Sequence, residues 1–395
     1  KANDAIDDDT GYFDSSAYSF WTDGSSFPAD HPTGQGDGFQ VNLGGAASKL
    51  GITRTVYTLA DTPTPDRTAN IDINSNANNL ISETTKTDFS ISNSLFNVST
   101  DADREEIVDW ILGIDVKDID EDTDFSEASR FMSDPLHSRP TVVTYGGTED
   151  NPDDTLFSID NGGAFRAIDT DNGEELFAFI PPELLKNQKL YMDNDATNVT
   201  DNGKSKFIYG LDGPMTIWHE ESSDDNDIIV NSDGSGGDRV YAYFGMRRGG
   251  DNYYAMNVTD RDDPQLMWTI FGPNNSTPTG GFSDLGQTWS EPKLQKVLWG
   301  CGTSCDPTNP AHIKDVLFFA GGYDPIHDTA TSPTTGDKGA AIYMVDAEDG
   351  SLLWSAGNSN SSDTHNLELQ MENSIPGDLT VADINGDGAA DILFA

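Results

Sequence analysis

Residues 240–268 read VYAYFGMRRGGDNYYAMNVTDRDDPQLMW, and this stretch decides the fold. It contains three strand-like segments in succession. The first, Val240–Gly245, is apolar and runs into glycines. The second, Tyr253–Val258, alternates and ends near an acid and a turn, and the third, Pro264–Trp268, ends on an aromatic residue. Short β-rich segments separated by glycine- and aspartate-rich turns favour antiparallel strands.

The same order of segments recurs along the chain from about residue 134. Each repeat opens on a proline followed by a β-rich segment, and steps of 74, 78 and 84 residues separate Pro140, Pro214, Pro292 and Pro376. Three repeats carry an aromatic residue in the last strand, namely Phe177, Trp268 and Trp354. Four strands per repeat, with an aromatic residue near the end, are typical of propeller blades. A minimal blade has only about 40–50 residues, so these repeats must carry long loops.

We therefore expect an all-β fold: a modified β-propeller with quinoprotein-like blades of four antiparallel strands, long loop insertions and few short helices. Residues 133–395 would form three full blades and the start of a fourth, leaving the propeller incomplete at its C-terminal end. Residues 1–132 would pack on the propeller or complete it. This N-terminal segment offers one strand over 51–59 and one helix over 101–112, which has an acidic first turn and is followed by Gly113.

The nonapeptide DINGDGAAD at residues 383–391 has the spacing of a calcium-binding loop. Side-chain oxygens fall at loop positions 1, 3, 5 and 9, and Gly388 falls at position 6, where the loop needs a sharp turn. Three carboxylates so close together would repel one another without a cation between them. The candidate ligands of Ca2+ are the side chains of Asp383, Asn385, Asp387 and Asp391 and the backbone carbonyl of Ala389.

The flanking residues distinguish this loop from a helical EF-hand. Position 12 of an EF-hand is Glu, but here it is Phe394, and residues 392–395 resemble a strand. The loop would lie between the first and second strands of the fourth repeat. A weaker second candidate has Thr123 where a calcium loop needs glycine. Its alternating acids are Asp118, Asp120, Asp122 and Asp124.

The charge of the chain limits its partners. With 22 Lys and Arg against 68 Asp and Glu, the net charge is −46, which excludes binding to nucleic acid through its phosphates and predicts repulsion from anionic membrane surfaces. A salty medium that screens self-repulsion explains this composition. No apolar run is long enough to span a membrane. Because the chain starts at Lys1 without a signal peptide, we expect a processed or truncated piece.

The two cysteines, Cys301 and Cys305, stand in the sequence CGTSC. Their spacing is longer than that of a redox Cys-x-x-Cys motif, and the segment offers too few further ligands for zinc. A disulfide that closes a small loop is the favoured interpretation, and it indicates an oxidising compartment.

Several strings along residues 133–395 resemble the C-terminal propeller domain of the PilY-type type IV pilus biogenesis factors, also called pilus tip-associated adhesins. They are Ser133–Pro140, Ala178–Pro182, Arg248–Met256, Leu285–Pro292 and the loop 383–391. The resemblance implies a modified seven-bladed propeller whose calcium loop regulates pilus extension and retraction. It also implies an extracellular or cell-surface location at the pilus tip, reached by export through the periplasm. Minor pilins or other tip subunits would be the partners, with a surface or host receptor as a further one.

Some members of that family carry an Arg-Gly-Asp site for integrins. This chain has no such tripeptide, because Arg248 and Asp251 are separated by two glycines. The N-terminal adhesive domain that often precedes the propeller in this family is also absent from these 395 residues.

Two other functions fit parts of the pattern. A quinone-dependent dehydrogenase has similar blades, but its calcium is held by residues from several blades and its quinone needs a basic cluster. An integrin-like repeat propeller would carry the calcium loop in successive blades, whereas here it is fully formed once. The neighbours His137 and Ser138 suggest a hydrolase, but sequence neighbours rarely give triad geometry, and we expect His137 to be structural. We therefore predict a calcium-binding protein that is not an enzyme.

Overall fold

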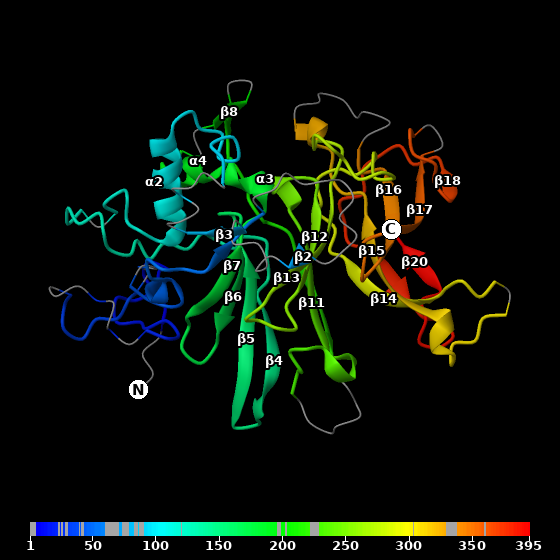
Figure 1. Ribbon diagram of the computed structural model, residues 1–395, viewed down its shortest axis with the longest axis horizontal. Helices are drawn as coiled ribbons and strands as arrows, with labels where there is room; N and C mark the ends of the chain where they lie inside the picture. Colours follow the sequence, from blue (N-terminus) through cyan, green and yellow to red (C-terminus); the bar gives the residue numbers. More distant parts are fainter. Residues whose placement is uncertain are drawn as a thin grey trace. The chain divides into compact units, whose positions relative to one another are not determined.

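The computed structural model describes residues 5–22, 24, 27, 31–38, 40, 43–59, 71–72, 79–82, 86, 91–119, 121–195, 199–201, 204–221, 229–302, 304–328, 338–358 and 361–395. Within these ranges the chain is mostly β-strand with a few short helices (Figure 1). The prediction of a mostly β chain with few helices is confirmed. No helix in the described ranges has the length and apolar character needed to cross a membrane.

The chain divides into two compact units. The first comprises Lys1–Asp61, Asn76–Asp134 and Val142–Ile208, and the second comprises Thr62–Ser75, Pro135–Thr141 and Tyr209–Ala395. Each unit contains strands from both the repeats and the N-terminal segment.

The first unit holds a six-stranded sheet in the order β3-β1-β7-β6-β5-β4. Its four longer strands follow one another in sequence: β4 (Thr141–Thr148), β5 (Asn151–Ile159), β6 (Phe165–Asp169) and β7 (Glu175–Phe179). Two short strands from far upstream extend this sheet. β1 (Val56–Tyr57) pairs parallel to β7, with Val56 opposite Ala178, and β3 (Leu80–Ile81) pairs antiparallel to β1.

The second unit holds two five-stranded sheets. One has the order β10-β11-β12-β13-β2, with β10 (Met215–Glu220), β11 (Arg239–Gly245), β12 (Tyr253–Asn257), β13 (Gln265–Ile270) and β2 (Ile71–Asp72). The other has the order β14-β15-β16-β17-β18, with β14 (Lys293–Leu298), β15 (Ile313–Ala320), β16 (Ala341–Asp346), β17 (Leu352–Asn358) and β18 (Leu367–Leu369). The first four strands of each sheet are consecutive and antiparallel, as the repeats predict.

The remaining elements are short. Two hairpins are formed by β8 (Val199–Asp201) with β9 (Lys204–Lys206) and by β19 (Thr380–Ala382) with β20 (Ile392–Phe394). Among the described residues, the α-helices are α2 (Asp101–Leu112), α3 (Pro182–Leu185) and α4 (Gln188–Met192). Single 3-10 turns span Ala47–Lys49, Ser235–Gly237, Arg247–Gly249, Pro310–His312 and Pro325–Asp328.

The repeats also agree in fine detail. In all three sheets the pairing of the third and fourth strands shifts register once, at Ala167/Ile168, Ala255/Met256 and Met344/Val345. The turns that follow β6 and β16 have the same hydrogen bonds. Gly173 N donates to Asp169 O, and Gly350 N donates to Asp346 O in the equivalent place. The sequence repeat is therefore also a structural repeat.

Helix α2 begins and ends where the sequence predicts. The hydroxyl of Thr100 accepts a hydrogen bond from Asp103 N, and Gly113 closes the helix in the left-handed region at φ 98°. Ile107 and Ile111 are buried. The helix therefore offers an apolar side to the first unit.

The two sheets of the second unit share a core. Trp268, within β13, is buried, and its indole N–H donates to Ala347 O at 3.1 Å in the turn between β16 and β17. The hydroxyl of Tyr243 donates to the same carbonyl. Gly350 in this turn lies against the Trp268 ring, where a Cβ would come within 2.7 Å. The expectation that the aromatic residue of the repeat is a packing residue is confirmed for Trp268.

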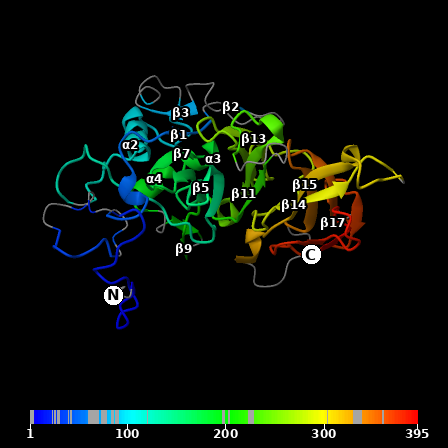
Figure 2. The ribbon, with the colours of Figure 1, turned by 90° about the horizontal axis from the view of Figure 1, so that it is seen from below.

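The other two repeat aromatics also pack against strands. Phe177 is buried in the first unit, and Trp354 is half-buried among the side chains that join the third sheet to the C-terminal hairpin. Figures 1 and 2 both draw the C terminus close to β17.

The first unit has a comparable indole contact from a different source. Trp21, in the N-terminal segment, donates its indole N–H to Thr170 O at 2.6 Å. Gly173 lies against the Trp21 ring, and a Cβ on this glycine would again come within 2.7 Å of the ring. Thr170 and Gly173 hold the same places in their turn as Ala347 and Gly350 hold in the later one.

A buried ion cluster ties the N-terminal segment to the first sheet. The guanidinium of Arg54 pairs with Glu175 at 2.8 Å and donates to Ile111 O at the end of α2. Arg166 on β6 pairs with the same Glu175 and with Asp160. Burial alone would raise the pKa of Glu175, but the charges of Arg54 and Arg166 hold it below its ordinary value.

Candidate metal centre

The hairpin β19–β20 carries the predicted calcium loop. Thr380 pairs with Phe394 and Ala382 with Ile392, so residues 383–391 form the connection between two antiparallel strands. A strand, not a helix, follows the loop, as the sequence indicates. Ala390 N donates to Lys296 O on β14, and Val381 and Leu393 pack against the core of the third sheet. The loop is thus anchored at its base.

Asp383, at position 1, accepts three hydrogen bonds from backbone N–H groups of the loop. Its Oδ2 accepts from Gly388 N at 2.8 Å, and its Oδ1 accepts from Gly386 N at 2.7 Å and from Asn385 N at 3.2 Å. The bonds from Gly388 and then Gly386 lower the pKa of Asp383. Gly386 and Gly388 have positive φ, 77° and 86°, a conformation that glycine adopts without strain.

The other candidate side-chain ligands also accept hydrogen bonds from backbone N–H groups of the loop. Asn385 Oδ1 accepts from Asp387 N at 2.8 Å, and Asp387 Oδ1 accepts from Ala389 N at 2.9 Å. Asp391, which ends the loop, accepts from Ile384 N at 3.0 Å and from the Asn385 side-chain amide at 3.3 Å. One short loop therefore contains all five predicted positions, and its side-chain oxygens receive backbone N–H groups of the same loop.

The oxygen-only donor set suits a hard cation such as Ca2+. In the described part of the chain, however, no three His, Cys, Asp or Glu side chains stand close enough together to hold a metal ion as they are placed. Calcium binding at this loop therefore stays a prediction.

The second acidic run forms consecutive turns. Asp118 Oδ1 accepts from Thr123 N at 2.9 Å, and Asp124 Oδ1 accepts from Ser126 N at 2.9 Å. Asp118, Glu121 and Thr123 all have positive φ. The described residues of this segment form turns and no strand, and Asp120 lies outside the described residues.

His137 has the structural role expected of it. Its Nδ1 lies 2.8 Å from Oδ2 of Asp212, which is fully buried, and Arg247 approaches the same oxygen at 3.4 Å. Asp212 lies 75 residues from His137, and no local motif marks it.

Sequence reasoning missed a second polar array. His365 is buried, with its Nδ1 3.0 Å from Ser355 Oγ and its Nε2 3.0 Å from Asp284 Oδ2. Ser355 is only 1% exposed, so a substrate has no access to its hydroxyl. The array holds residues after β17 against the loop before β14. Its three members come from separate segments, so no sequence spacing could signal it.

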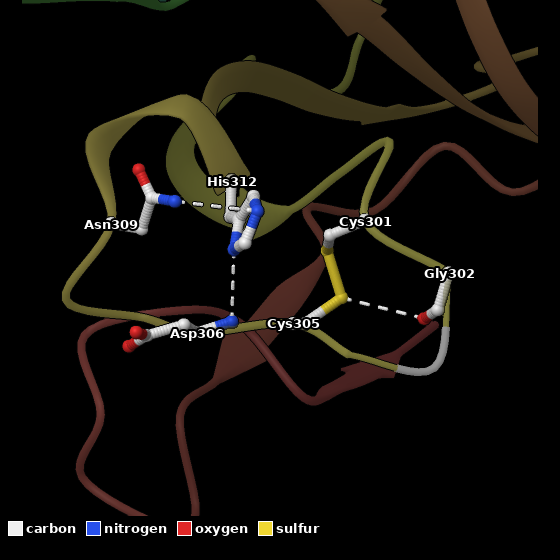
Figure 3. The surroundings of a disulfide bond; sticks show 6 residues. All are labelled: Cys301, Gly302, Cys305, Asp306, Asn309 and His312. Atoms are coloured by element: carbon white, nitrogen blue, oxygen red, sulfur yellow. Dashed lines mark hydrogen bonds between the residues drawn. A yellow bond between two sulfur atoms is a disulfide. The ribbon is translucent and has the colours of Figure 1, made fainter.

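The disulfide between Cys301 and Cys305 is present, with a Cα–Cα separation of 5.0 Å. It lies in the β14–β15 connection (Figure 3). Next to it, Asp306 N donates to Nδ1 of His312 at 3.0 Å, and the side-chain amide nitrogen of Asn309 lies 3.4 Å from Nε2 of the same ring. Asn309 caps the short turn Pro310–His312 through Ala311 N. The disulfide prediction is confirmed.

Comparison with known proteins finds relatives among the type IV pilus proteins. The chain is 23% identical over 268 residues to the type IV pilus biogenesis factor PilY1 of Pseudomonas aeruginosa strain UCBPP-PA14, covering 67% of this chain and 18% of that protein. PilY1 of strain PAK is 22% identical over the same length. This chain is similar to PilY-type pilus biogenesis factors. The resemblance seen in the sequence is thereby confirmed.

The chain spans about a fifth of the length of these PilY1 relatives, 18%. The crystal structure of the Pseudomonas aeruginosa PilY1 C-terminal domain matches with a TM-score of 0.35 and 19% identity, over 61% of this chain and 36% of that one. No protein-family model matches. The relatives are biogenesis factors, which agrees with the prediction that this protein is not an enzyme.

Proposed function

We propose that this protein is a calcium-binding pilus biogenesis module of the PilY type, acting outside the cell at the tip of a type IV pilus. Its three four-stranded repeats and the β19–β20 hairpin would be blades of a modified propeller. The similarity to PilY1 supports the pilus assignment. The observation that carries the calcium assignment is the loop 383–391, which contains five oxygen ligands within nine residues on an anchored hairpin.

Calcium would be held by Asp383, Asn385, Asp387, the carbonyl of Ala389 and Asp391, and would neutralise the charge that these carboxylates share. The side chains of Asp383 and Asp391 already turn toward the loop interior. Binding would order the excursion from Pro376 to Asp391 and so control a contact with pilin-like tip subunits. Loops on one face of the propeller would make that contact.

Calorimetric titration of calcium into the purified protein tests the site. We expect one site with a dissociation constant of about 0.1–1 mM, the range of extracellular calcium modules. Asp383→Ala and Asp391→Ala should each abolish it, because each removes a carboxylate at one end of the loop. The matched control is Asp122→Ala in the second acidic run, which should leave the heat and stoichiometry unchanged.

Two results would contradict the assignment. Full binding by both loop variants would show that the calcium lies elsewhere, and loss of binding in Asp122→Ala alone would move the site to the second acidic run. The partner proposal has a separate test, in which purified minor pilins are captured on the immobilised protein with calcium or with a chelator. Equal capture under both conditions would reject control by calcium while leaving the calcium site itself intact.

A further inference from the structure

Two arginines and an indole form a cluster in the second unit, away from the calcium loop in sequence. The guanidinium carbon of Arg247 lies 4.2 Å from the centroid of the Trp289 ring, and that of Arg248 lies 4.9 Å from it. Tyr323 packs on Trp289 with its centroid 4.8 Å away, and Tyr209 lies 5.8 Å from the Arg248 guanidinium. Such cation–aromatic contacts orient a guanidinium and shield it from water on one side.

The backbone around this cluster is fixed. Arg247 has φ 49°, an uncommon conformation for a residue with a side chain. Thr288, which is fully buried, holds the turn: its Oγ1 accepts from Met246 N, and its carbonyl accepts from Arg247 N. Gly249 passes so close to the chain that a Cβ would meet Gly210 O at 1.8 Å. The arginines are therefore presented on a rigid turn.

The aromatic side of the cluster is fixed as well. Gln287 and Tyr323 exchange two backbone hydrogen bonds, of 2.8 and 2.9 Å. The side chain of Gln287 accepts from the Trp289 indole at 3.2 Å and donates to Arg248 O at 3.3 Å. The indole is thus tied to the turn that carries the arginines.

The two guanidinium groups differ in what they bind. Arg247 approaches buried Asp212, which also contacts His137. Arg248 is exposed, and no carboxylate among the residues that the structure describes forms an ion pair with it. That is unusual in a chain where acids outnumber bases by 68 to 22. Arg239 provides the contrast: it stacks on Trp218 at 4.6 Å but pairs with Glu348 at 3.0 Å.

We propose that Arg248, framed by Trp289 and Tyr209, is the binding site for a carboxylate from an acidic peptide segment of a partner protein. A guanidinium has a planar fork of donors that matches a carboxylate bidentately, and here it is pre-oriented by the indole. A long polyanion such as a sulfated polysaccharide fits poorly, because its further charges would meet a surface of the same sign. A short segment with few carboxylates avoids that repulsion.

Titration calorimetry with two blocked peptides tests this site on the full chain at low salt with a chelator present, so that the calcium loop takes no part. The acidic peptide acetyl-GDEGDG-amide should bind with a dissociation constant of about 0.1–1 mM. The neutral peptide acetyl-GNQGNG-amide should not bind. Arg248→Ala should weaken binding of the acidic peptide about tenfold or more, and Arg248→Lys should restore part of it, because a lysine keeps the charge but loses the fork.

Arg239→Ala is the matched control. It removes one positive charge and two cation–aromatic contacts, with Trp218 and Tyr241, from the same unit. It should change peptide affinity by less than about twofold, because this guanidinium is already paired with Glu348. Equal affinity of the two peptides, equal affinity of Arg248→Ala and the unaltered protein, or no binding at about 5 mM peptide would each overturn the proposal. Binding of heparin in place of the acidic peptide would also overturn it.

Discussion

Glu175 is the residue on which the buried charges of the first unit converge. Its two carboxylate oxygens contact Arg54 from the N-terminal segment and Arg166 from the neighbouring strand, and its side chain is only 4% exposed. Removing one partner of a buried ion pair leaves the other charge without compensation, and this usually costs more than the intact pair contributes. A single carboxylate therefore holds the N-terminal segment on the sheet.

We expect Glu175→Gln to lower the free energy of unfolding by about 3–5 kcal/mol, because Arg54 and Arg166 would then be buried beside a neutral amide. Urea unfolding monitored by circular dichroism measures this. The matched control is Glu149→Gln at an exposed site, which should change the free energy by less than about 0.5 kcal/mol. Equal stability of the two variants would contradict the assignment.

Glu175 should also make the free energy of unfolding depend on pH, and the direction follows from its pKa. The pKa of Glu175 is lower in the folded protein than in the unfolded chain. The ionised carboxylate therefore stabilises the fold above the unfolded value of about 4.3, and this contribution is lost as the pH falls through the lowered folded value. Urea unfolding at a series of acidic pH values should show a smaller loss of stability in Glu175→Gln than in the unaltered protein. Parallel curves would contradict this.

Individual residues differ in whether their contacts can be predicted from the sequence. The loop 383–391 could be singled out from the sequence because its five candidate ligand positions lie within nine residues and its glycines mark the turns. Calcium binding there stays a prediction. The ring of His365 meets Asp284 and Ser355 across 81 and 10 residues. Arg248 owes its orientation to Trp289, 41 residues downstream by number. Such contacts depend on how the strands align in the folded protein, and the spacing of neighbouring residues in the sequence does not predict that alignment.

At the scale of the element, the turn between β16 and β17 makes a testable contact with β13. Gly350→Ala should lower the free energy of unfolding by about 2–4 kcal/mol, since a Cβ would meet the Trp268 ring at 2.7 Å and the residue has φ 71°. The control Gly377→Ala, with nothing within 4 Å of its Cβ position, should be close to neutral.

A double-mutant cycle with Trp268→Ala separates the two causes of that loss. If the ring causes the conflict, the two substitutions together should cost at least about 1 kcal/mol less than their sum. Strict additivity in thermal or urea unfolding would mean that backbone strain alone accounts for the effect.

The disulfide belongs to the same scale, because it closes a loop of only five residues within one strand connection. In the chain-entropy model a loop this short contributes at most about 2 kcal/mol. Reduction should therefore lower the free energy of unfolding in urea by no more than about 2 kcal/mol, and it should speed proteolysis within the 299–312 connection. A Cys301→Ser/Cys305→Ser variant should already be cleaved quickly and should not respond to reductant. A large loss of global stability on reduction would contradict this.

At the scale of the whole molecule, the net charge of −46 predicts strong salt dependence. Raising NaCl from about 0.1 M to about 1 M shortens the Debye length from roughly 10 Å to 3 Å and so screens the repulsion among carboxylates. With a chelator present, Tm should rise by several degrees. Sucrose at equal osmolality serves as the control, and an equal rise with sucrose would remove the electrostatic explanation.

The sheets show which part of the architecture the sequence could predict. Alternation and turn residues mark the four consecutive strands of each repeat, because neighbouring strands pair through short turns. The added strands could not be placed this way. The strand predicted over 51–59 is only Val56–Tyr57, and no local pattern shows that it pairs parallel to β7 from more than a hundred residues upstream. β18, which pairs parallel to β17, has too few residues for a pattern.

The indole contacts described for Trp21 and Trp268 have a consequence for how this architecture tolerates change. Trp268 comes from a strand and Trp21 from an irregular segment, yet each donates to the equivalent carbonyl of its own turn and rests on the equivalent glycine. The turn therefore needs an indole ring over its glycine and an indole N–H at its carbonyl. The tryptophan that supplies them can belong to a strand or to an irregular segment. Irregular chain can take over a neighbouring strand's role whenever it brings one correctly placed tryptophan.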